Sequence, residues 1–276
     1  MEKVEKNKKS FSNRLKSMLR VDFYRMLRSR LFYIIIACAL LVPIIMTVML
    51  TMMDGQESVN QQTGEITILE GPDYVWESIG SLPSDKQADG EEAAMGNMDV
   101  MALCNINMAF MGVAIFVCLF ISDDFRSGYS KNLFTVRSKR TEYVISKTLM
   151  GFICGALMLL AYFVGAMLGG AISGLSFELT GGLTLMNIVM CMIAKILLML
   201  VFVSIFVIIS IGARSKAWLS ICGSLGGGML LFMMVSMITP LGSTIANVGL
   251  CLAGGLIFAV GLGAISRVVL RKANMI

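Results

Sequence analysis

The chain has 276 residues, of which 57% are hydrophobic and 15% are charged, and its formal net charge is +5. A soluble globular domain averages about 45–50% apolar and about 25% charged residues, so this composition excludes a disordered chain, a disulfide-stapled secreted module and a soluble enzyme. Histidine is absent, which excludes imidazole catalysis and imidazole metal sites, and the seven cysteines form no C-x-x-C pair. We therefore expect one all-α membrane domain over residues 1–276.

The first predicted element is residues 11–30, which read FSNRLKSMLRVDFYRMLRSR. Apolar side chains recur there every three or four residues, at Leu15, Leu19, Phe23 and Met26/Leu27, and basic side chains flank them. This pattern predicts a basic amphipathic helix that lies on an anionic inner leaflet before the first span. The alternative is ordinary flanking charge with no role beyond orientation. The arginines assigned to this interfacial helix are Arg14, Arg20, Arg25 and Arg28.

Six segments hold the roughly 20 apolar residues that a helix needs to cross a bilayer core about 30 Å thick. Three consecutive glycines at 226–228 predict a bend midway down the fifth of them, because each glycine weakens a helix. Small residues four apart, such as Gly165 and Gly169, predict close packing of helix backbones. The predicted spans are residues 31–53, 100–121, 149–174, a fourth that starts between 183 and 192 and ends near 211, 217–239 and 245–266.

The distribution of basic residues predicts the orientation of these spans. Of the 23 lysines and arginines, 21 lie in residues 1–30, in residues 122–147, in the link at Arg214 and Lys216, or in the C-terminal tail. The positive-inside rule makes that side cytoplasmic. Both termini are then cytoplasmic, as six spans require.

Residues 54–98 form the largest predicted outer element, a loop of about 45 residues, which is longer than a simple connection needs to be. The loop carries ten acids and a single base, Lys86. The stretch GEITILEGPDYVWESIG within it predicts one short strand and one short helix. We expect the negative charge to attract a cationic, partly hydrophobic peptide, with Trp76 as the apolar contact. A passive, solvated acidic loop is the alternative.

Lys195 is the one charge that falls within a predicted span. If the fourth span starts at Leu183, Lys195 lies deep in the membrane and is a functional candidate, because a buried charge is costly. If the span starts near Cys191, Lys195 reaches the outer interface, and residues 183–190 form a short outer or re-entrant helix. The continuous apolar run over 196–211 favours the interfacial position. Together with Trp76, Lys195 is a candidate for facing the substrate.

The inner loop over residues 120–147 reads FISDDFRSGYSKNLFTVRSKRTEYVISK. Asp123 and Asp124 lie where the second span leaves the membrane, and Gly128 permits a sharp turn after them. A short helix across the ends of two spans is expected next, and Thr141 can cap and restart the helix that leads into the third span. Lipid alone gives little reason for such a D-D-x-x-x-G turn, so we interpret the loop as a docking surface.

This loop resembles that of permease subunits of the type-2 ABC exporter superfamily. Their pattern is F-x-x-E-x-x-x-G-T-I-K-N-L-L, then a Ser-Arg or Lys-Arg pair, then a lysine that opens the next span. Here an Asp pair replaces the Glu, and Tyr129-Ser130 replaces Thr-Ile. The nearest group is the bacterial permeases of lantibiotic and bacitracin export or self-immunity. The matching positions are Phe120, Asp123, Asp124, Gly128, Lys131, Asn132, Leu133, Arg140 and Lys147.

The resemblance implies a non-catalytic permease subunit in the bacterial plasma membrane. The chain contains no phosphate-binding loop of the G-x-x-x-x-G-K-[ST] type, so ATP and Mg²⁺ would be bound by a separate ATPase subunit. The other implied partners are a second permease, identical or a sister chain, and a hydrophobic or cationic peptide-like substrate; nucleic acid is not among them. The residues expected to couple to the ATPase are Asp123, Asp124, Gly128, Arg137, Lys139 and Arg140.

Two other classes of protein fit the composition less well. A membrane-embedded enzyme needs paired carboxylates, a Ser–His or Ser–Lys pair or a metal site within the spans, and the spans lack paired carboxylates. A secondary transporter or a channel usually shows several intramembrane charges and an inverted repeat, whereas this chain has one ambiguous lysine and no repeat. We therefore expect the permease.

Overall fold

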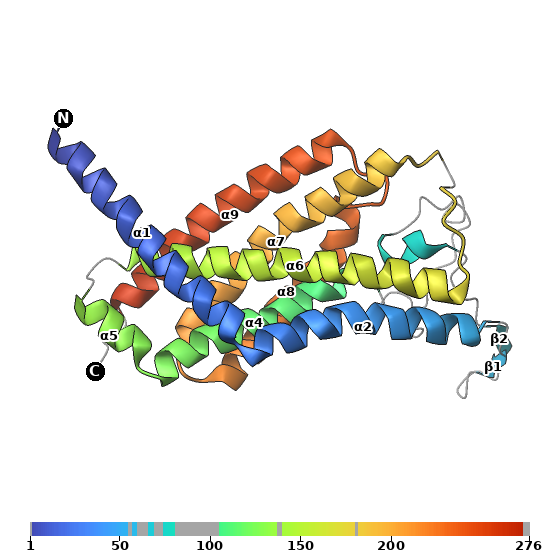
Figure 1. Ribbon diagram of the computed structural model, residues 1–276, viewed down its shortest axis with the longest axis horizontal. Coiled ribbons are helices and arrows are strands. Elements are labelled where there is room, and N and C mark those ends of the chain that lie inside the picture. The colour runs from blue at the N-terminus through green and yellow to red at the C-terminus, as the bar shows by residue number, and fades with distance from the viewer. Residues whose placement is uncertain are drawn as a thin grey trace.

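The structure is a computed structural model that describes residues 2–54, 57–59, 66–68, 74–80, 105–136, 140–179 and 182–272. These residues form a bundle of long helices, with one pair of three-residue strands at its edge (Figure 1). The helices and strands are α1 (Glu2–Arg28), α2 (Arg30–Met52), β1 (Glu57–Val59), β2 (Ile66–Ile68), the 3₁₀ helix η1 (Val75–Ser78), α4 (Met108–Arg126), α5 (Tyr129–Val136), α6 (Thr141–Ser173), α7 (Leu185–Ala213), α8 (Ala217–Ile238) and α9 (Ile245–Lys272).

Each of the six predicted spans corresponds to a helix of the described structure. Five of them, α2, α4, α6, α7 and α9, are long and apolar enough to cross a membrane. The apolar stretch found within α8, Ala217–Phe232, is shorter than the other five. The all-helical architecture is therefore as predicted, while the six-span topology stays a prediction.

Helix α6 begins at Thr141, where the sequence predicted that the helix leading into the third span restarts. The helix runs for 33 residues, so eight of its residues precede the apolar span expected from residue 149. Its first two turns carry Glu142, Tyr143 and Lys147, which are all buried. Polar residues that neighbouring helices bury and bond can continue a helix where a hydropathy pattern ends, so the apolar run understated its length.

The glycine run predicted a break or bend midway down the fifth span, and the structure shows no break there. Helix α8 runs without interruption through residues 226–228. A Cβ atom added at Gly228 would lie 3.3 Å from side-chain atoms of Met111 and Phe206, which indicates that this glycine allows close packing on α4 and α7. Tertiary packing thus overrides the low helix propensity of the glycine run.

The predicted close approach at Gly165 and Gly169 is confirmed. A Cβ atom at Gly165 would lie 2.3 Å from the backbone oxygen of Leu40, and one at Gly169 would lie 3.0 Å from the Cα atom of Ile44. The missing side chains let α2 and α6 lie backbone to backbone along their length (Figure 1).

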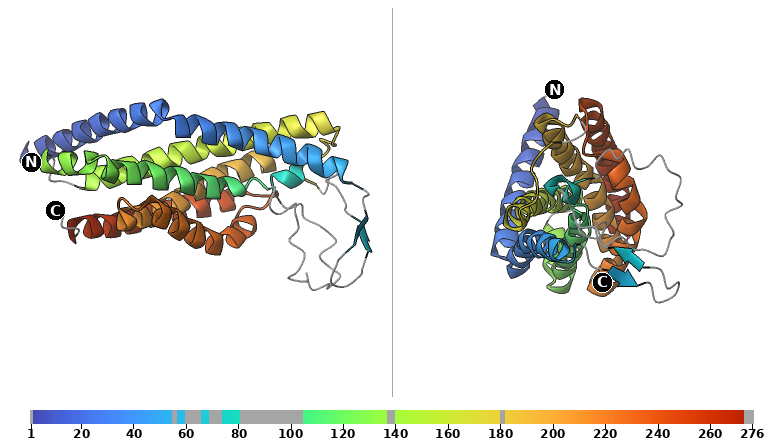
Figure 2. Two further views of the ribbon diagram at one scale, coloured as in Figure 1. Left: turned by 90° about the horizontal axis from the view of Figure 1, so that it is seen from below. Right: turned by 90° about the vertical axis from the view of Figure 1, so that its right-hand side faces the viewer.

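The two ends of the bundle differ (Figure 2). The start of α1, α5 and the end of α9 lie at one end, which we call the terminal end, and β1, β2 and η1 lie at the other. Strands β1 and β2 pair antiparallel, with Ser58 opposite Thr67. The short strand and short helix predicted in this segment are confirmed as β2 and η1, whereas β1 was not predicted.

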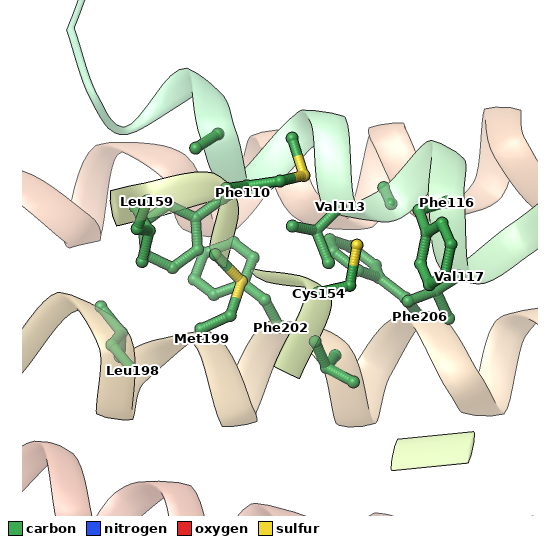
Figure 3. Close-up of a cluster of buried hydrophobic side chains, with 14 of the residues drawn as sticks. Phe110, Val113, Phe116, Val117, Cys154, Leu159, Leu198, Met199, Phe202 and Phe206 are labelled. Carbon is green, nitrogen blue, oxygen red and sulfur yellow. The ribbon is translucent and has the colours of Figure 1, made fainter. Parts of the chain in front are cut away.

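Aromatic and sulfur-containing side chains fill the centre of the bundle where α4, α6 and α7 meet (Figure 3). The rings of Phe110 and Phe202 lie 4.7 Å apart between centroids, and Cys154 and Met199 are fully buried beside them. This core is apolar, and the buried charges of the described residues lie outside it.

Candidate functional site

Four charged side chains meet in the interior near the terminal end. Asp22 and Arg25 come from α1, Asp124 from α4 and Lys147 from α6, so the contacts among them join these three helices. The side chains of Asp22, Asp124 and Lys147 have no exposed surface, and that of Arg25 is 26% exposed. We call these four residues the ion cluster. Its two acids and two bases balance, so its formal net charge is zero.

Lys147 joins the two carboxylates of the ion cluster. Its Nζ atom lies 2.9 Å from Oδ1 of Asp22 and 2.7 Å from Oδ2 of Asp124. The same ammonium lies 4.1 Å from the centroid of the Phe120 ring, a cation–π distance. One lysine therefore ties α1, α4 and α6 together inside the protein.

Neutral hydroxyl groups complete the hydrogen bonding of the carboxylates. Ser146 donates from Oγ to Oδ2 of Asp22 at 2.6 Å, and Tyr143 donates from its hydroxyl to Oδ2 of Asp124 at 3.0 Å. Buried ion pairs persist only where the remaining lone pairs are also satisfied, because desolvation otherwise exceeds the Coulombic gain. This completeness points to a rigid, specific junction of helices.

Arg25 extends the junction to the short helix α5. Its Nη1 atom lies 2.6 Å from Oδ1 of Asp124, and its guanidinium lies 4.4 Å from the ring centroid of Tyr129, the first residue of α5. Burial by itself lowers the pKa of Arg25, but the facing charge of Asp124 outweighs it and the pKa is raised. Arg25 therefore stays charged within the ion cluster.

A second ion pair fixes α1 on α6. The Nε atom of Arg14 lies 2.9 Å from Oε1 of Glu142, whose side chain is 2% exposed. Arg14 and Asp22 are eight residues apart on α1, about 12 Å along the helix axis. Two points of attachment at this spacing fix both the position and the direction of α1.

A further buried charge, that of Lys195 in α7, has only neutral hydrogen-bond partners among the described residues. Its side chain is fully buried, with Nζ 2.7 Å from Oδ1 of Asn107 and 3.2 Å from Oγ1 of Thr239. Asn107 in turn donates from Nδ2 to Oγ of Ser236 at 3.0 Å. We call Lys195, Asn107, Ser236 and Thr239 the lysine site; it joins α7 to the start of α4 and the end of α8.

Comparison with known families decides what kind of protein carries these sites. The family model for the ABC-2 family transporter protein matches residues 81–230, more than half of the chain. The chain belongs to the ABC-2 transporter family. Comparison with curated proteins and with solved structures found no match.

Membership of the ABC-2 family makes the chain a multi-pass membrane protein and the permease subunit of an ABC transporter. This membrane subunit generally carries out no catalysis, and its family implies an ATPase partner. The family match favours the permease over the secondary transporter or channel that we considered from the sequence. The match to residues 81–230 includes α4, α5, α6, α7 and most of α8.

Some of the permease residues that were expected to couple to the ATPase are exposed in the structure, and others are buried. Gly128 makes the predicted turn, with φ +74°, and α5 is the predicted short helix after it. Asp123 has a side chain 68% exposed and lies 3.6 Å from Arg25. Asp124 is fully buried, so its predicted contact with a partner needs correction: it bonds Arg25, Tyr143 and Lys147 inside the permease.

The remaining loop residues lie at the start of α6. Helix α6 restarts at Thr141 as predicted, although the residue at its N-cap is Arg140, which makes no capping bond there. The Arg140 guanidinium donates to the backbone oxygen of Leu270 and lies over the Phe134 ring, so it links α5, α6 and α9. Arg137 and Lys139 lie outside the described residues.

The interfacial interpretation of the N-terminal helix of the permease needs a correction at two arginines. Arg14 and Arg25 form ion pairs with α6 and α4, whereas Arg20 and Arg28 are exposed. The predicted apolar stripe included Phe23, which is 42% exposed. The buried face of α1 is rotated about the helix axis relative to the predicted apolar stripe. The pairing of its charged side chains with buried charges decides which side of the helix packs against the bundle.

Asp22 is the member of the ion cluster that the sequence analysis missed. Met18, Asp22 and Met26 are four residues apart and all buried, so they form one face of α1. An acidic residue among apolar residues of a basic helix, as Asp22 is, predicts that the acid is paired with a buried basic partner. Ser146 and Tyr143 were missed as well, and ordinary periodicity gives no signal for them.

Two further corrections concern the residues that were expected to face the substrate. The interfacial position favoured for Lys195 is wrong, because α7 starts at Leu185 as one continuous helix and buries the lysine. Trp76 is 6% exposed; its Nε1 atom donates to the backbone oxygen of Phe177 at 3.3 Å, and its ring meets the Phe177 ring edge-on. Trp76 therefore anchors η1 to the chain after α6 and offers no apolar surface to a ligand in this conformation.

Proposed function

We propose that this permease exports a hydrophobic or cationic peptide-like substrate across the bacterial plasma membrane, driven by a separate ATPase subunit that binds ATP and Mg²⁺. The observation that carries the coupling half of this proposal is the ion cluster. It joins α1, α4 and α6 at the terminal end, directly beside α5. The relation to the lantibiotic and bacitracin group, for export or self-immunity, belongs to the same proposal and rests on the inner-loop residues of the sequence.

The coupling step follows from how these helices are connected. An ATPase that moves the loop over residues 122–147 displaces α5, which contacts Arg25 through Tyr129. The ion cluster passes that displacement to α1 and to α6, because charge pairs with short, fully satisfied bonds do not slide past one another. Helices α2 and α6 then move as one body, since their backbones touch at Gly165. A second permease subunit, identical or a sister chain, completes the pathway in this proposal.

Reversing the charges of Arg137 and Lys139 to glutamate is expected to uncouple or release the ATPase. Both residues lie in the loop between α5 and α6, and a charge reversal adds repulsion where a basic docking surface meets its partner. The measurement is co-purification of the ATPase with the permease, together with substrate-stimulated ATP hydrolysis. Arg140 is left intact, because its contacts with Leu270 and Phe134 are internal.

The matched control for this test reverses Arg214 and Lys216, two exposed basic residues in the link between α7 and α8. The same change in net charge at this link should leave ATPase binding unaltered. Full assembly and stimulated hydrolysis in the Arg137/Lys139 variant, equal to that of the control, would show that the loop is not the docking surface.

The cargo half of the proposal is supported by the acidity of residues 54–98, with ten acids and one lysine. Changing Asp73, Glu77, Asp85, Asp89, Glu91 and Glu92 to the corresponding amides is expected to weaken export of cationic peptides several-fold at low ionic strength. The effect should fade as salt rises, because the Debye length falls to about 8 Å at physiological ionic strength. Export of an uncharged hydrophobic peptide serves as the control, and equal loss for both peptides, or loss for neither, contradicts the assignment.

The proposed topology has six spans with both termini in the cytoplasm. A reporter fused after Ile276 and one inserted near Gly64 are expected on opposite sides of the membrane, because 21 of the 23 basic residues lie in the segments that are predicted to be cytoplasmic. Cytoplasmic and external reporter activities from the two fusions are the measurement. Two reporters on one side would overturn the six-span arrangement.

A further inference from the structure

We propose that a groove between α6 and α9 binds one anionic phospholipid, with an acyl chain in the groove and the phosphate on Arg267. The groove has a volume of about 420 Å³ and is lined by five residues of α6 between Thr141 and Leu149, by Leu200 of α7 and by five residues of α9 between Ala259 and Arg267, among them Gly263. Its lining comes from α6, α7 and α9, three helices that are each long and apolar enough to cross a membrane, so lipid is the medium expected around it.

The groove is polar at one end and apolar at the other. Helices α6 and α9 run in opposite directions, so Thr141 and Arg267 both lie toward the terminal end while Leu149 and Val260 both lie deeper (Figure 1). Eight residues of α6 separate Thr141 from Leu149, about 12 Å of helix. A hydroxyl and a guanidinium at the end of an apolar groove have the polarity of a lipid: a phosphate followed by hydrocarbon.

Arg267 is the cation in this position that is available to a ligand. It is exposed, and no ion pair joins it to a carboxylate in the described part of the chain. Arg140 nearby is already engaged with Leu270 and Phe134. An arginine guanidinium binds phosphate oxygens in a forked, bidentate geometry, and the proposed inner leaflet is the anionic side of a membrane.

Small residues on α9 keep the apolar part of the groove open. A Cβ atom built on Gly263 meets a single atom within 4 Å, Cγ1 of Val144 at 4.0 Å. A larger side chain therefore fits at this position without a clash and fills the space that the acyl chain would occupy. Gly261, two residues away, has nothing within 4 Å and lies outside the groove lining, which makes it a matched control.

The test uses the full-length permease, purified with a mixture of phosphatidylglycerol and phosphatidylcholine of identical acyl chains and weighed by native mass spectrometry. The wild type should retain one phosphatidylglycerol in preference to phosphatidylcholine. Arg267→Gln should lower that preference about tenfold, because a charge-assisted bond to phosphate is lost. Gly263→Leu should remove the bound lipid of either kind. Gly261→Leu and Lys216→Gln should behave as the wild type.

Three outcomes would overturn the proposal. The wild type could retain no lipid in a one-to-one ratio. Arg267→Gln and Gly263→Leu could both keep the wild-type lipid and the wild-type preference. Gly263→Leu could change the ratio of monomer to dimer and leave the lipid unaltered, which would assign the groove to a second permease subunit. Thermal unfolding of each variant in detergent separates loss of lipid from loss of fold.

Discussion

Replacing Lys147 by methionine is expected to destabilise the permease by about 3–5 kcal/mol and to abolish transport, because removal of one partner leaves uncompensated buried charge. Among the described residues, only the ammonium of Lys147 contacts both Asp22 and Asp124 at under 3 Å. Without it, two buried carboxylates share the remaining base, Arg25, whose nearest contact is with Asp124 at 2.6 Å. The junction of α1 with α6 should then loosen.

The free energy of unfolding of four proteins measures this effect: the wild type, Lys147→Met, Asp22→Asn and the double variant. The double variant is formally neutral again, with the pair of Arg25 and Asp124 intact. It should therefore be more stable than the sum of the two single changes predicts, by about 0.5–3 kcal/mol. Lys131→Met, an exposed lysine on α5, is the matched control for the substitution.

Additive losses in this cycle would mean that Lys147 and Asp22 do not interact, and the ion cluster would lose its place in the coupling step. A destabilised single variant whose transport per folded molecule is normal would keep the cluster as a structural feature and remove it from the mechanism. The two readouts, unfolding free energy and transport, thus separate a fold role from a coupling role.

Replacing Lys195 by methionine is expected to stabilise the fold, unlike the replacement of Lys147, and to impair transport as that replacement does. Burying a cation without a carboxylate is costly, so an apolar side chain of similar length should stabilise the fold by about 1 kcal/mol or more. This gain is the net effect, after the cost of leaving Asn107 and Thr239 each without one hydrogen-bond partner. Transport should fall by at least about tenfold if the lysine acts in the pathway, the equivalent of about 1.4 kcal/mol in a barrier.

The measurement compares melting temperature and transport rate of Lys195→Met with those of Leu198→Met, which is buried on the same helix and carries no charge. A lower melting temperature with transport equal to that of Leu198→Met would show that Lys195 serves the packing of α4, α7 and α8 alone. A higher melting temperature with lost transport would show that the permease retains a destabilising charge for its function.

The sequence alone determined the features of this protein that depend on neighbours along the chain. Apolar runs located the six helices that correspond to the predicted spans, and α8 matched its predicted bounds to within one residue at its end. Glycine chemistry predicted the turn at Gly128, and the segment before residue 80 yielded the short strand and short helix that are present as β2 and η1. The inner-loop pattern indicated the superfamily, and the family match confirms it at that level.

Only the tertiary structure decided where the buried charges and Trp76 lie. Asp22 and Lys147 are 125 residues apart, so their contact depends on how α1 docks across α6. An isolated lysine in an apolar run fits an interface as well as an interior, and only Asn107 and Thr239 make the interior acceptable for Lys195. From the sequence, Trp76 is expected to be a surface residue of an acidic loop, whereas in the structure it packs against Phe177. Hydropathy and helix propensity are local sums over neighbouring residues, whereas the cost of burying a charge or a ring is set by partners that folding brings from elsewhere in the chain.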